Sequence, residues 1–207
     1  MENFNSKNHW EKVYCTKELK DVSWYQHTPT ISLKFLSEFN IDKNAKIIDV
    51  GGGDSFLADN LIESGYKDIT VLDISETAIE KAKKRLGEKA SKVKWIIADA
   101  AEFNPSEQYD FWHDRAAFHF LTSEEQSNTY VETAKKGIKR NGYLVLGTFS
   151  ETGPLKCSGL EIKRYSEESM SKKFEKYFTR IKCLKEDHHT PFNTIQNFLF
   201  CSFKKEN

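Results

Sequence analysis

The chain has 207 residues, of which 38% are hydrophobic, and it carries equal numbers of basic and acidic side chains, 31 of each. This length can bury one substantial core, so we expect a single domain. A net charge of zero disfavours an obligate nucleic-acid partner, because phosphate neutralisation requires a cationic face. No apolar run approaches the roughly 18 residues that span a bilayer, and no signal-peptide h-region is present, so we expect a cytoplasmic protein without membrane association.

The cysteines are scattered along the chain and form no C-x-x-C pair; they are Cys15, Cys157, Cys183 and Cys201. We therefore expect free thiols, with neither a disulfide framework nor a zinc knuckle. The neighbouring His188 and His189 make a poor metal pair, because adjacent strand residues point to opposite faces. The sequence predicts no bound metal.

After an aromatic amino-terminal segment, residues 46–50 form a short apolar run that predicts a buried strand. The run ends in three glycines, and Asp54 or Ser55 is placed to cap a helix that ends at Gly65. Glycines at such a turn allow the backbone to approach a ligand closely. The carboxylates of Asp49 and Asp54 beside the turn disfavour a pyrophosphate and favour a ligand with positive charge.

A second strand is predicted at 69–72, followed by a helix that Ser75 caps and Gly87 ends. The basic run at 81–85 within this helix is expected to face solvent. Further strands are predicted at 93–98 and 109–113.

Ser123 opens a capping box before the next helix, and Asn141-Gly142 predicts a turn into a fifth strand at 143–149. The tail lacks a helical pattern between 177–185 and 196–203, which indicates an antiparallel hairpin added to the sheet. Strands and helices alternate before it, as in a doubly wound Rossmann-like α/β fold with helices on both faces of a mostly parallel sheet.

Acidic residues stand at the predicted carboxyl ends of the first three strands, where ligands bind in such sheets. Asp49 ends the first strand, Asp73 the second, and Asp99 follows the third. Asp73 has the spacing from the glycine turn at which an acid accepts both ribose hydroxyls of an adenosine. Asp99 is placed to accept the adenine amino group, with a backbone donor from Ala100.

These features together resemble the class I S-adenosylmethionine-dependent methyltransferases. The resemblance extends from about Lys46 to the carboxyl terminus and rests on four segments, Asp49–Gly53, Val71–Ser75, Ala98–Ala100 and Tyr109–Arg115. It implies seven strands with the last one antiparallel, and S-adenosylmethionine as the cofactor. It places these residues at the cofactor: Asp49, Gly51, Gly52, Gly53, Ser55, Asp73, Ile74, Asp99, Ala100 and His113.

The segment 1–40 carries the aromatic motifs HWEKVY and SWYQ at 9–14 and 23–26. It is similar to the lid of a small subgroup that includes citrate synthase lysine methyltransferases. The resemblance implies a lid at 1–40 over a methyltransferase core at 41–207. Trp10, Tyr14, Trp24, Tyr25 and Gln26 are its candidate contacts, because aromatic faces attract a sulfonium and exclude water. The alternative is a helix that only packs its aromatics on the domain surface.

The residues after the fourth strand are the candidates for the acceptor side. Asp114 is expected to hold a cation, Arg115 to orient a carboxylate, and His119 to act as a base, or else as a core histidine. Phe118 and Phe120 are expected to wall the site. Further acceptor-side candidates are the segments 156–160 and 188–191, with Arg164 and Tyr165 between them.

The methyl acceptor remains open between a small molecule, including a thiol, and a protein lysine. A cofactor-binding module without turnover is the alternative from another class, and an NAD-dependent oxidoreductase is a weaker one. No P-loop motif is present, which excludes phosphoryl transfer of that type. The sequence leaves the oligomeric state undetermined.

Overall fold

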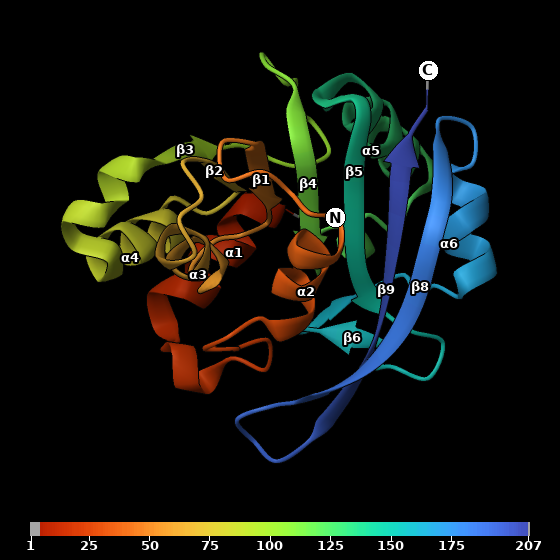
Figure 1. Ribbon diagram of the computed structural model, residues 1–207. Helices are drawn as coiled ribbons and strands as arrows, with labels where there is room; N and C mark the ends of the chain where they lie inside the picture. Colours follow the sequence, from red (N-terminus) through yellow and green to blue (C-terminus); the bar gives the residue numbers. More distant parts are fainter. Residues whose placement is uncertain (1–4, 207) are drawn as a thin grey trace.

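The computed structural model describes residues 5–206, which fold around one seven-stranded sheet (Figure 1). The strand order is β3-β2-β1-β4-β5-β9-β8. The sheet strands are β1 (Lys46–Val50), β2 (Asp68–Asp73), β3 (Val93–Ile97), β4 (Tyr109–Arg115), β5 (Ile138–Phe149), β8 (Phe178–His189) and β9 (Ile195–Lys205). A small separate hairpin consists of β6 (Lys156–Cys157) and β7 (Leu160–Glu161).

The first five strands are parallel, and β9 is antiparallel to both of its neighbours, β5 and β8. β1 lies in the middle, where Ile48 is the register partner of Thr70 on one side and of Trp112 on the other. The expected doubly wound sheet with a reversed last strand is therefore confirmed. β5 begins earlier than the sequence predicted, and Asn141 lies inside it with a φ of 62°, so Asn141-Gly142 does not begin the strand.

Helices cover both faces of the sheet. They are α1 (Ser6–Thr16), α2 (Thr30–Glu38), α3 (Leu57–Glu63), α4 (Glu76–Leu86), α5 (Glu124–Gly137) and α6 (Glu167–Phe174), with short 3-10 turns η1 (Leu19–Asp21), η2 (Gly87–Lys92) and η3 (Phe118–Phe120). Apolar residues of α5 and α6 pack with one face, and those of α2 and α3 with the other. Because strand side chains alternate between faces, neighbours such as Ile47 and Ile48 belong to opposite cores.

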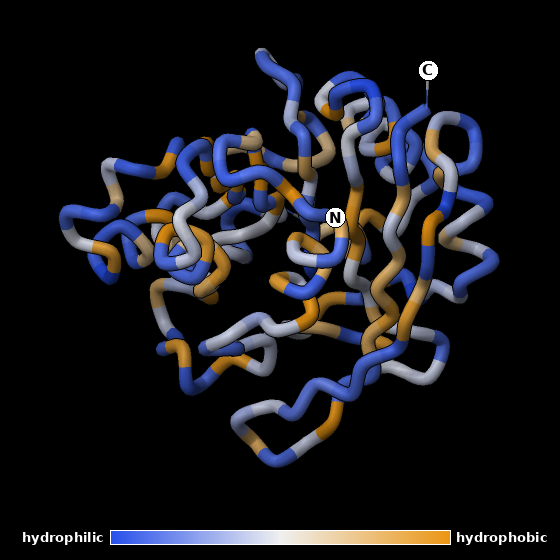
Figure 2. Tube along the Cα trace, in the orientation of Figure 1, coloured by the Kyte–Doolittle hydropathy of each residue, from blue (hydrophilic) through white to orange (hydrophobic). Residues whose placement is uncertain are grey.

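Figure 2 shows the apolar residues concentrated along the central strands and the hydrophilic ones on the outer helices and the loop ends. Within the described part of the chain, no helix has both the length and the apolar character needed to cross a membrane.

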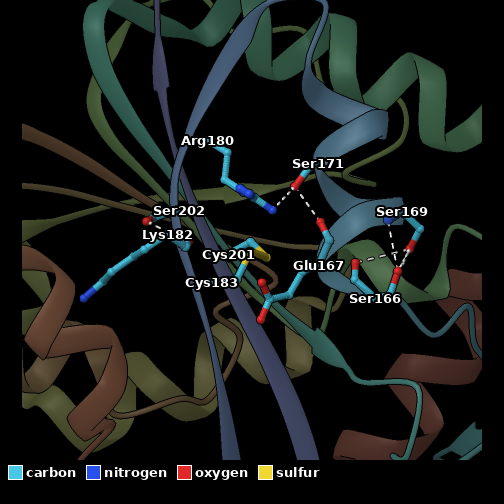
Figure 3. Close-up of a disulfide and its surroundings, with 9 residues drawn as sticks. All are labelled: Ser166, Glu167, Ser169, Ser171, Arg180, Lys182, Cys183, Cys201 and Ser202. Atoms are coloured by element: carbon cyan, nitrogen blue, oxygen red, sulfur yellow. Dashed lines mark hydrogen bonds between the residues drawn. A yellow bond between two sulfur atoms is a disulfide. The ribbon is translucent and has the colours of Figure 1, made fainter.

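Two cysteines that we expected to be free form a disulfide between the last two strands. Cys183 of β8 and Cys201 of β9 are register partners with their Cα atoms 4.1 Å apart, and Figure 3 shows the bond joining the strands. The expectation of four free thiols is therefore wrong for this pair. No short spacing signals such a bond, because it is the register of the hairpin that brings the two cysteines together. Cys15 and Cys157 remain free.

The start of α3 also differs from its expected form. Its N-cap is Phe56, which makes no side-chain cap bond. Asp54 does not cap it as predicted, because its carboxylate forms an ion pair with Arg85. The Ser55 hydroxyl, one residue before the N-cap, accepts a long hydrogen bond of 3.4 Å from the Leu57 amide and donates to Asp49 across 3.3 Å. The predicted caps are confirmed for α4, where Ser75 accepts from the Ala78 amide, and for α5, where Ser123 accepts from the Gln126 amide.

Candidate functional site

A cavity of about 320 Å³ opens beside the carboxyl ends of the parallel strands. Many residues that the sequence predicts in the site line it: Trp10, Tyr14, Trp24, Gly51, Asp73, Ile74, Asp99, Ala100, Arg115, Phe120, Cys157 and Leu160. A smaller cavity of about 50 Å³ is lined by Tyr25, Gln26, Asp49, Gly52, Ser55 and His113 among others. The two cavities share Tyr14, Trp24, Gly51 and Arg115, so they adjoin.

The glycine turn after β1 is packed too closely for side chains. A Cβ on Gly51 would lie 2.6 Å from the Cβ of Ala117, and Gly51 has a φ of 69°. A Cβ on Gly53 would lie 2.7 Å from Oδ2 of Asp73 and 2.8 Å from the Tyr14 hydroxyl. Gly53 therefore lies behind the cavity wall and lets Asp73 at the end of β2 and Tyr14 of α1 approach each other.

Asp73 is only 5% exposed and ends β2 at the cavity wall. Its Oδ1 accepts a hydrogen bond of 2.8 Å from the Ser75 amide. Burial, reinforced by the nearby carboxylates of Asp49 and Glu11, raises the pKa of Asp73 to about 7. The same burial, with the charge of Asp73, raises the pKa of the Tyr14 hydroxyl well above its usual value. A polar ligand that donates hydrogen bonds to Asp73 would favour the ionised carboxylate.

The other predicted acids are also held by local hydrogen bonds. Asp49 is buried and bonds Nδ1 of His113 across 2.7 Å, while Nε2 of His113 bonds the Ser32 hydroxyl across 2.8 Å. These two hydrogen bonds tie β1 and β4 to α2 at the smaller cavity. Asp99 accepts from the Ala101 amide across 2.8 Å, which fixes the loop that leads away from β3.

Arg115 lies at the junction of the two cavities and carries unused donors. Its Nη1 donates to the Trp24 carbonyl across 3.0 Å, and its guanidinium stacks over Phe198 at 4.7 Å. Nε and Nη2 are buried and have no hydrogen-bond partner among the described residues. Burial lowers the pKa of Arg115 to about 10, so the group remains a cation at neutral pH. Buried cationic donors without protein partners could hold an anionic ligand group at this place.

Four aromatic rings form one side of the larger cavity. The Trp10 ring centroid lies 5.0 Å from that of Phe120 and 5.9 Å from that of Trp24, both edge to face. The Tyr14 ring lies 6.2 Å from each tryptophan ring. We call Trp10, Tyr14, Trp24 and Phe120 the aromatic wall. It presents ring surfaces that suit a cation and leave little room for water.

The segment between α1 and α2 is anchored to the β8–β9 hairpin by His188. His188 is 4% exposed; its Nε2 bonds the Ser23 carbonyl across 2.7 Å, and its Nδ1 bonds the side-chain amide nitrogen of Gln26 across 3.2 Å. His189, the next residue, is exposed, as the alternation of side chains along a strand requires. The two rings therefore lie on opposite sides of β8, and His188 positions the segment between α1 and α2.

Asp114 is fully buried and does not line either cavity. Its carboxylate accepts from the Tyr130 hydroxyl at 2.6 Å and from the amides of Ala117 and Phe118 at 2.9 and 3.1 Å. Burial raises its pKa to about 6 despite these bonds. The structure thus places Asp114 under the turn that follows β4, where it holds the backbone of Ala116, a cavity residue with a φ of 71°.

His119 also lies outside the cavity lining, although its neighbour Phe120 is part of the aromatic wall. Its Nδ1 accepts from the Phe149 amide across 3.4 Å, so the neutral ring carries its proton on Nε2. Burial, with the nearby Arg115 charge, lowers the pKa of His119 to about 3. The neutral ring at this position is a donor at Nε2, which disfavours its expected use as a base. Phe118, expected as a wall, is buried in the core.

The β6–β7 hairpin completes the far side of the cavity. Cys157, Leu160 and Glu161 line it, and the turn between the two strands uses Ser158 and Gly159 with positive φ values of 51° and 82°. Burial raises the pKa of the Cys157 thiol to about 11, so it is neutral. The segment 156–160 was expected on the acceptor side, but Glu161 was not. The strands β6 and β7 have two residues each, which is too short for a periodic pattern, so the sequence did not indicate the hairpin that brings Glu161 to the cavity.

Arg85, in the last turn of α4, clamps the glycine turn. Its Nη2 donates to the Ser55 carbonyl at 2.7 Å and to Asp59 at 3.0 Å, and its guanidinium lies over the Phe56 ring at 4.2 Å. The expectation of a solvated basic run is therefore wrong for Arg85. Its ion pair with Asp54 also neutralises one carboxylate of the turn, so Asp54 offers no free charge to a ligand.

Comparisons with known proteins agree with this geometry. Residues 41–197 match the family model described as a methyltransferase domain. Malonyl-[acyl-carrier protein] O-methyltransferase of Anoxybacillus flavithermus (strain DSM 21510 / WK1) is 35% identical over 107 residues, which are 51% of this chain and 39% of that protein. EEF1A lysine methyltransferase 2 of Danio rerio is 25% identical over 158 residues, 68% of this chain and 67% of that protein.

A similar solved structure is 1,6-didemethyltoxoflavin-N1-methyltransferase of Burkholderia thailandensis, determined with 1,6-didemethyltoxoflavin and S-adenosylhomocysteine. It aligns with a TM-score of 0.71 at 15% identity, covering 98% of this chain and 84% of that one. At this identity the likeness shows a common fold. The chain spans less than half of the length of the first of the two curated relatives. The family match covers most of the chain, which therefore belongs to the methyltransferase-domain family, the class I S-adenosylmethionine-dependent methyltransferases.

Proposed function

We propose that this chain transfers a methyl group from S-adenosylmethionine to a thiol or another small soft nucleophile by in-line displacement. The main support is a cavity of about 320 Å³ whose lining brings Asp73 and Asp99 together with the aromatic wall. Small-ligand pockets run from roughly 300 to 1,000 Å³, so a bound cofactor would leave room here only for a small acceptor or the end of a side chain.

The residues present fit the adenosine part of the cofactor. Asp73 accepts the ribose hydroxyls in this proposal, because its Oδ1 already bonds the Ser75 amide and the carboxylate lines the cavity. Asp99 accepts the adenine amino group, and Ala100 offers its backbone to the ring. Ile74 lies beside them in the lining and supplies apolar contact.

The amino-acid end of the cofactor would lie between the two cavities. The free Nε and Nη2 donors of Arg115 bind its carboxylate, which gives these buried groups the partners that they lack among the described residues. Asp49 lies close by in the smaller cavity and offers negative charge to the ammonium group. Gly51 and Gly52 bring the backbone close to this end of the ligand.

S-adenosylmethionine supplies a methyl group bound to a positively charged sulfur, which makes that carbon electrophilic. The protein's part is to align the acceptor and exclude water, which Trp10, Trp24 and Phe120 do from one side of the cavity. In this proposal residues 1–40 act as a lid over a core formed by 41–207. Asp114 and His119 act through the backbone that they hold and do not touch the acceptor.

In this arrangement no buried side chain has to act as a base to remove the acceptor's proton. A thiol ionises close enough to neutral pH to lose its proton to solvent before it enters the cavity, and transfer then joins carbon to sulfur while the cofactor leaves as a neutral thioether. Cys157 is neutral and remains a wall residue.

A protein lysine is the second candidate acceptor. It is favoured by the exposed carboxylate of Glu161 at the cavity lining and by the similarity to EEF1A lysine methyltransferase 2 of Danio rerio. The citrate synthase lysine methyltransferase subgroup remains a prediction within this candidate. For either acceptor we propose a cytoplasmic protein that needs no nucleic acid or membrane.

The test uses the whole chain with methyl-labelled cofactor and either a metabolite pool or a protein lysate, and Asp73→Asn as the weak-binding control. Label in the small-molecule fraction that falls with the control supports the proposal. Label confined to protein supports the lysine candidate instead. Label in neither fraction, with cofactor binding intact, would mean that the chain is a binding module without turnover.

A further inference from the structure

The lid helix α1 contacts the amino end of α4 through one carboxylate. Glu11 accepts from the Glu76 amide at 2.6 Å through Oε1 and from the Thr77 amide at 3.2 Å through Oε2. These are first-turn amides of α4, which have no partner within their own helix. A side chain from another segment, 65 residues away, therefore supplies an end cap to this helix.

The position of the cap links it to the cofactor site. Glu11 stands beside Trp10, whose ring belongs to the aromatic wall. Glu76, which Glu11 caps, directly follows Ser75, and the Ser75 amide donates to Asp73. A continuous set of contacts thus runs from the lid helix to the acid at the end of β2.

Two weaker contacts reinforce the same junction. The Cys15 sulfur lies 3.4 Å from the Thr77 hydroxyl oxygen, and the Lys81 ammonium donates to the Lys17 carbonyl at 2.9 Å. Of these lid contacts, Glu11 alone brings a negative charge to the positive end of the α4 dipole, which makes it the strongest single candidate for holding α1.

We propose that Glu11 is a positioning residue that latches the lid helix to α4 and so holds the aromatic wall in place over Asp73 when the cofactor is bound. Release of the latch leaves the Glu76 and Thr77 amides to water and frees the α1 end of the lid. The inference rests on cofactor binding at Asp73 and is independent of which acceptor is used.

The experiment compares the whole wild-type chain with Glu11→Ala, Glu11→Gln and the control Glu80→Gln. Glu80 is an exposed carboxylate of α4 that pairs with Lys83 within the same helix. Affinity for S-adenosylmethionine is measured by calorimetry, and amide hydrogen exchange is measured over α1 (Ser6–Thr16) with and without the cofactor.

We expect Glu11→Ala to weaken cofactor binding about 3- to 30-fold, the range for loss of a helix cap, and to abolish the slowing of α1 exchange by the cofactor. Glu11→Gln keeps a carbonyl acceptor and should recover part of both effects, while Glu80→Gln should match the wild type. Wild-type affinity or undiminished α1 protection in Glu11→Ala would overturn the latch. Exchange that rises equally in α1 and in β1 would overturn it too, because Glu11 would then support the whole fold. Failure of the wild type itself to bind the cofactor would instead count against the proposed function.

Discussion

The buried acid at the end of β2 should weaken the fold at neutral pH. Burial raises the pKa of Asp73 to about 7 from its ordinary value of 3.8. The folded chain therefore binds this proton more tightly than the unfolded chain does. Stability falls as the pH rises from 3.8 towards about 7 and then levels off, because above that range both states are ionised.

The size of the effect follows from the shift. Three pKa units at about 1.4 kcal/mol each correspond to about 4 kcal/mol at pH 8, and the part already lost at pH 5 is about 1.6 kcal/mol. Asp73→Asn removes the ionisation but keeps an oxygen for the Ser75 amide. The variant's stability relative to the wild type should therefore increase by about 2.5 kcal/mol between pH 5 and pH 8. This pH-dependent change is independent of any constant packing cost of the substitution.

The assay is urea unfolding of both chains, without cofactor, at pH 5 and pH 8. Asp114 is present in both chains, so its own titration cancels in the difference. The same variant should bind S-adenosylmethionine at least about tenfold more weakly, because a ribose would lose a charge-assisted acceptor. A stability difference that is the same at both pH values would refute the burial argument, and unchanged cofactor affinity would mean that the ribose lies elsewhere.

Three other perturbations address the site and the sheet. Arg115→Met should weaken cofactor binding about tenfold or more in calorimetry, because the cofactor carboxylate would lose its donors. Arg164→Met is the control and should leave the affinity unchanged, because the Arg164 guanidinium bonds the loop carbonyls of Glu151 and Gly153. Equal losses of affinity in the two variants would contradict the assignment of the carboxylate to Arg115. His119→Gln should retain kcat within about threefold and the wild-type dependence of kcat on pH, since the Gln side chain can still accept from the Phe149 amide. If the variant instead loses the fall in activity at acidic pH, His119 acts as the base after all. Reduction of the disulfide between Cys183 and Cys201 should lower the free energy of unfolding by about 2–4 kcal/mol. In Cys183→Ser, urea unfolding should be the same with and without reductant. If reductant also leaves the unfolding of the wild type unchanged, the two cysteines are not bonded in solution.

The strand pattern and the glycine turn were predictable because their causes are local. β1 has the bounds expected from its apolar run, and Asp73 and Asp99 reach the cavity because parallel strands end at one edge of the sheet. The caps at Ser75 and Ser123 also follow from a few neighbouring residues. In each case one segment contains both the signal and the structure that it causes.

The carboxylates beside the glycine turn indicated the correct cofactor class for a partly wrong reason. Asp54 is neutralised by Arg85, which reaches back from the last turn of α4. The basic run at 81–85 did not indicate this ion pair, since Arg85 is the side chain of the run that reaches the turn. Such a pairing depends on how α4 packs against α3, which no local pattern specifies.

Local sequence patterns were enough to specify the doubly wound fold, the strand-end acids and the aromatic residues of the amino-terminal segment, because apolar periodicity and turn residues act over a few positions. Which of these residues face the cavity emerged only from the packing of the whole chain. That packing turned Asp114 and His119 into buried supports, joined Cys183 to Cys201, and set Glu11 on the end of α4. The physical reason is that burial and hydrogen-bond partners are properties of the folded chain, and many of the partners here stand tens of residues apart.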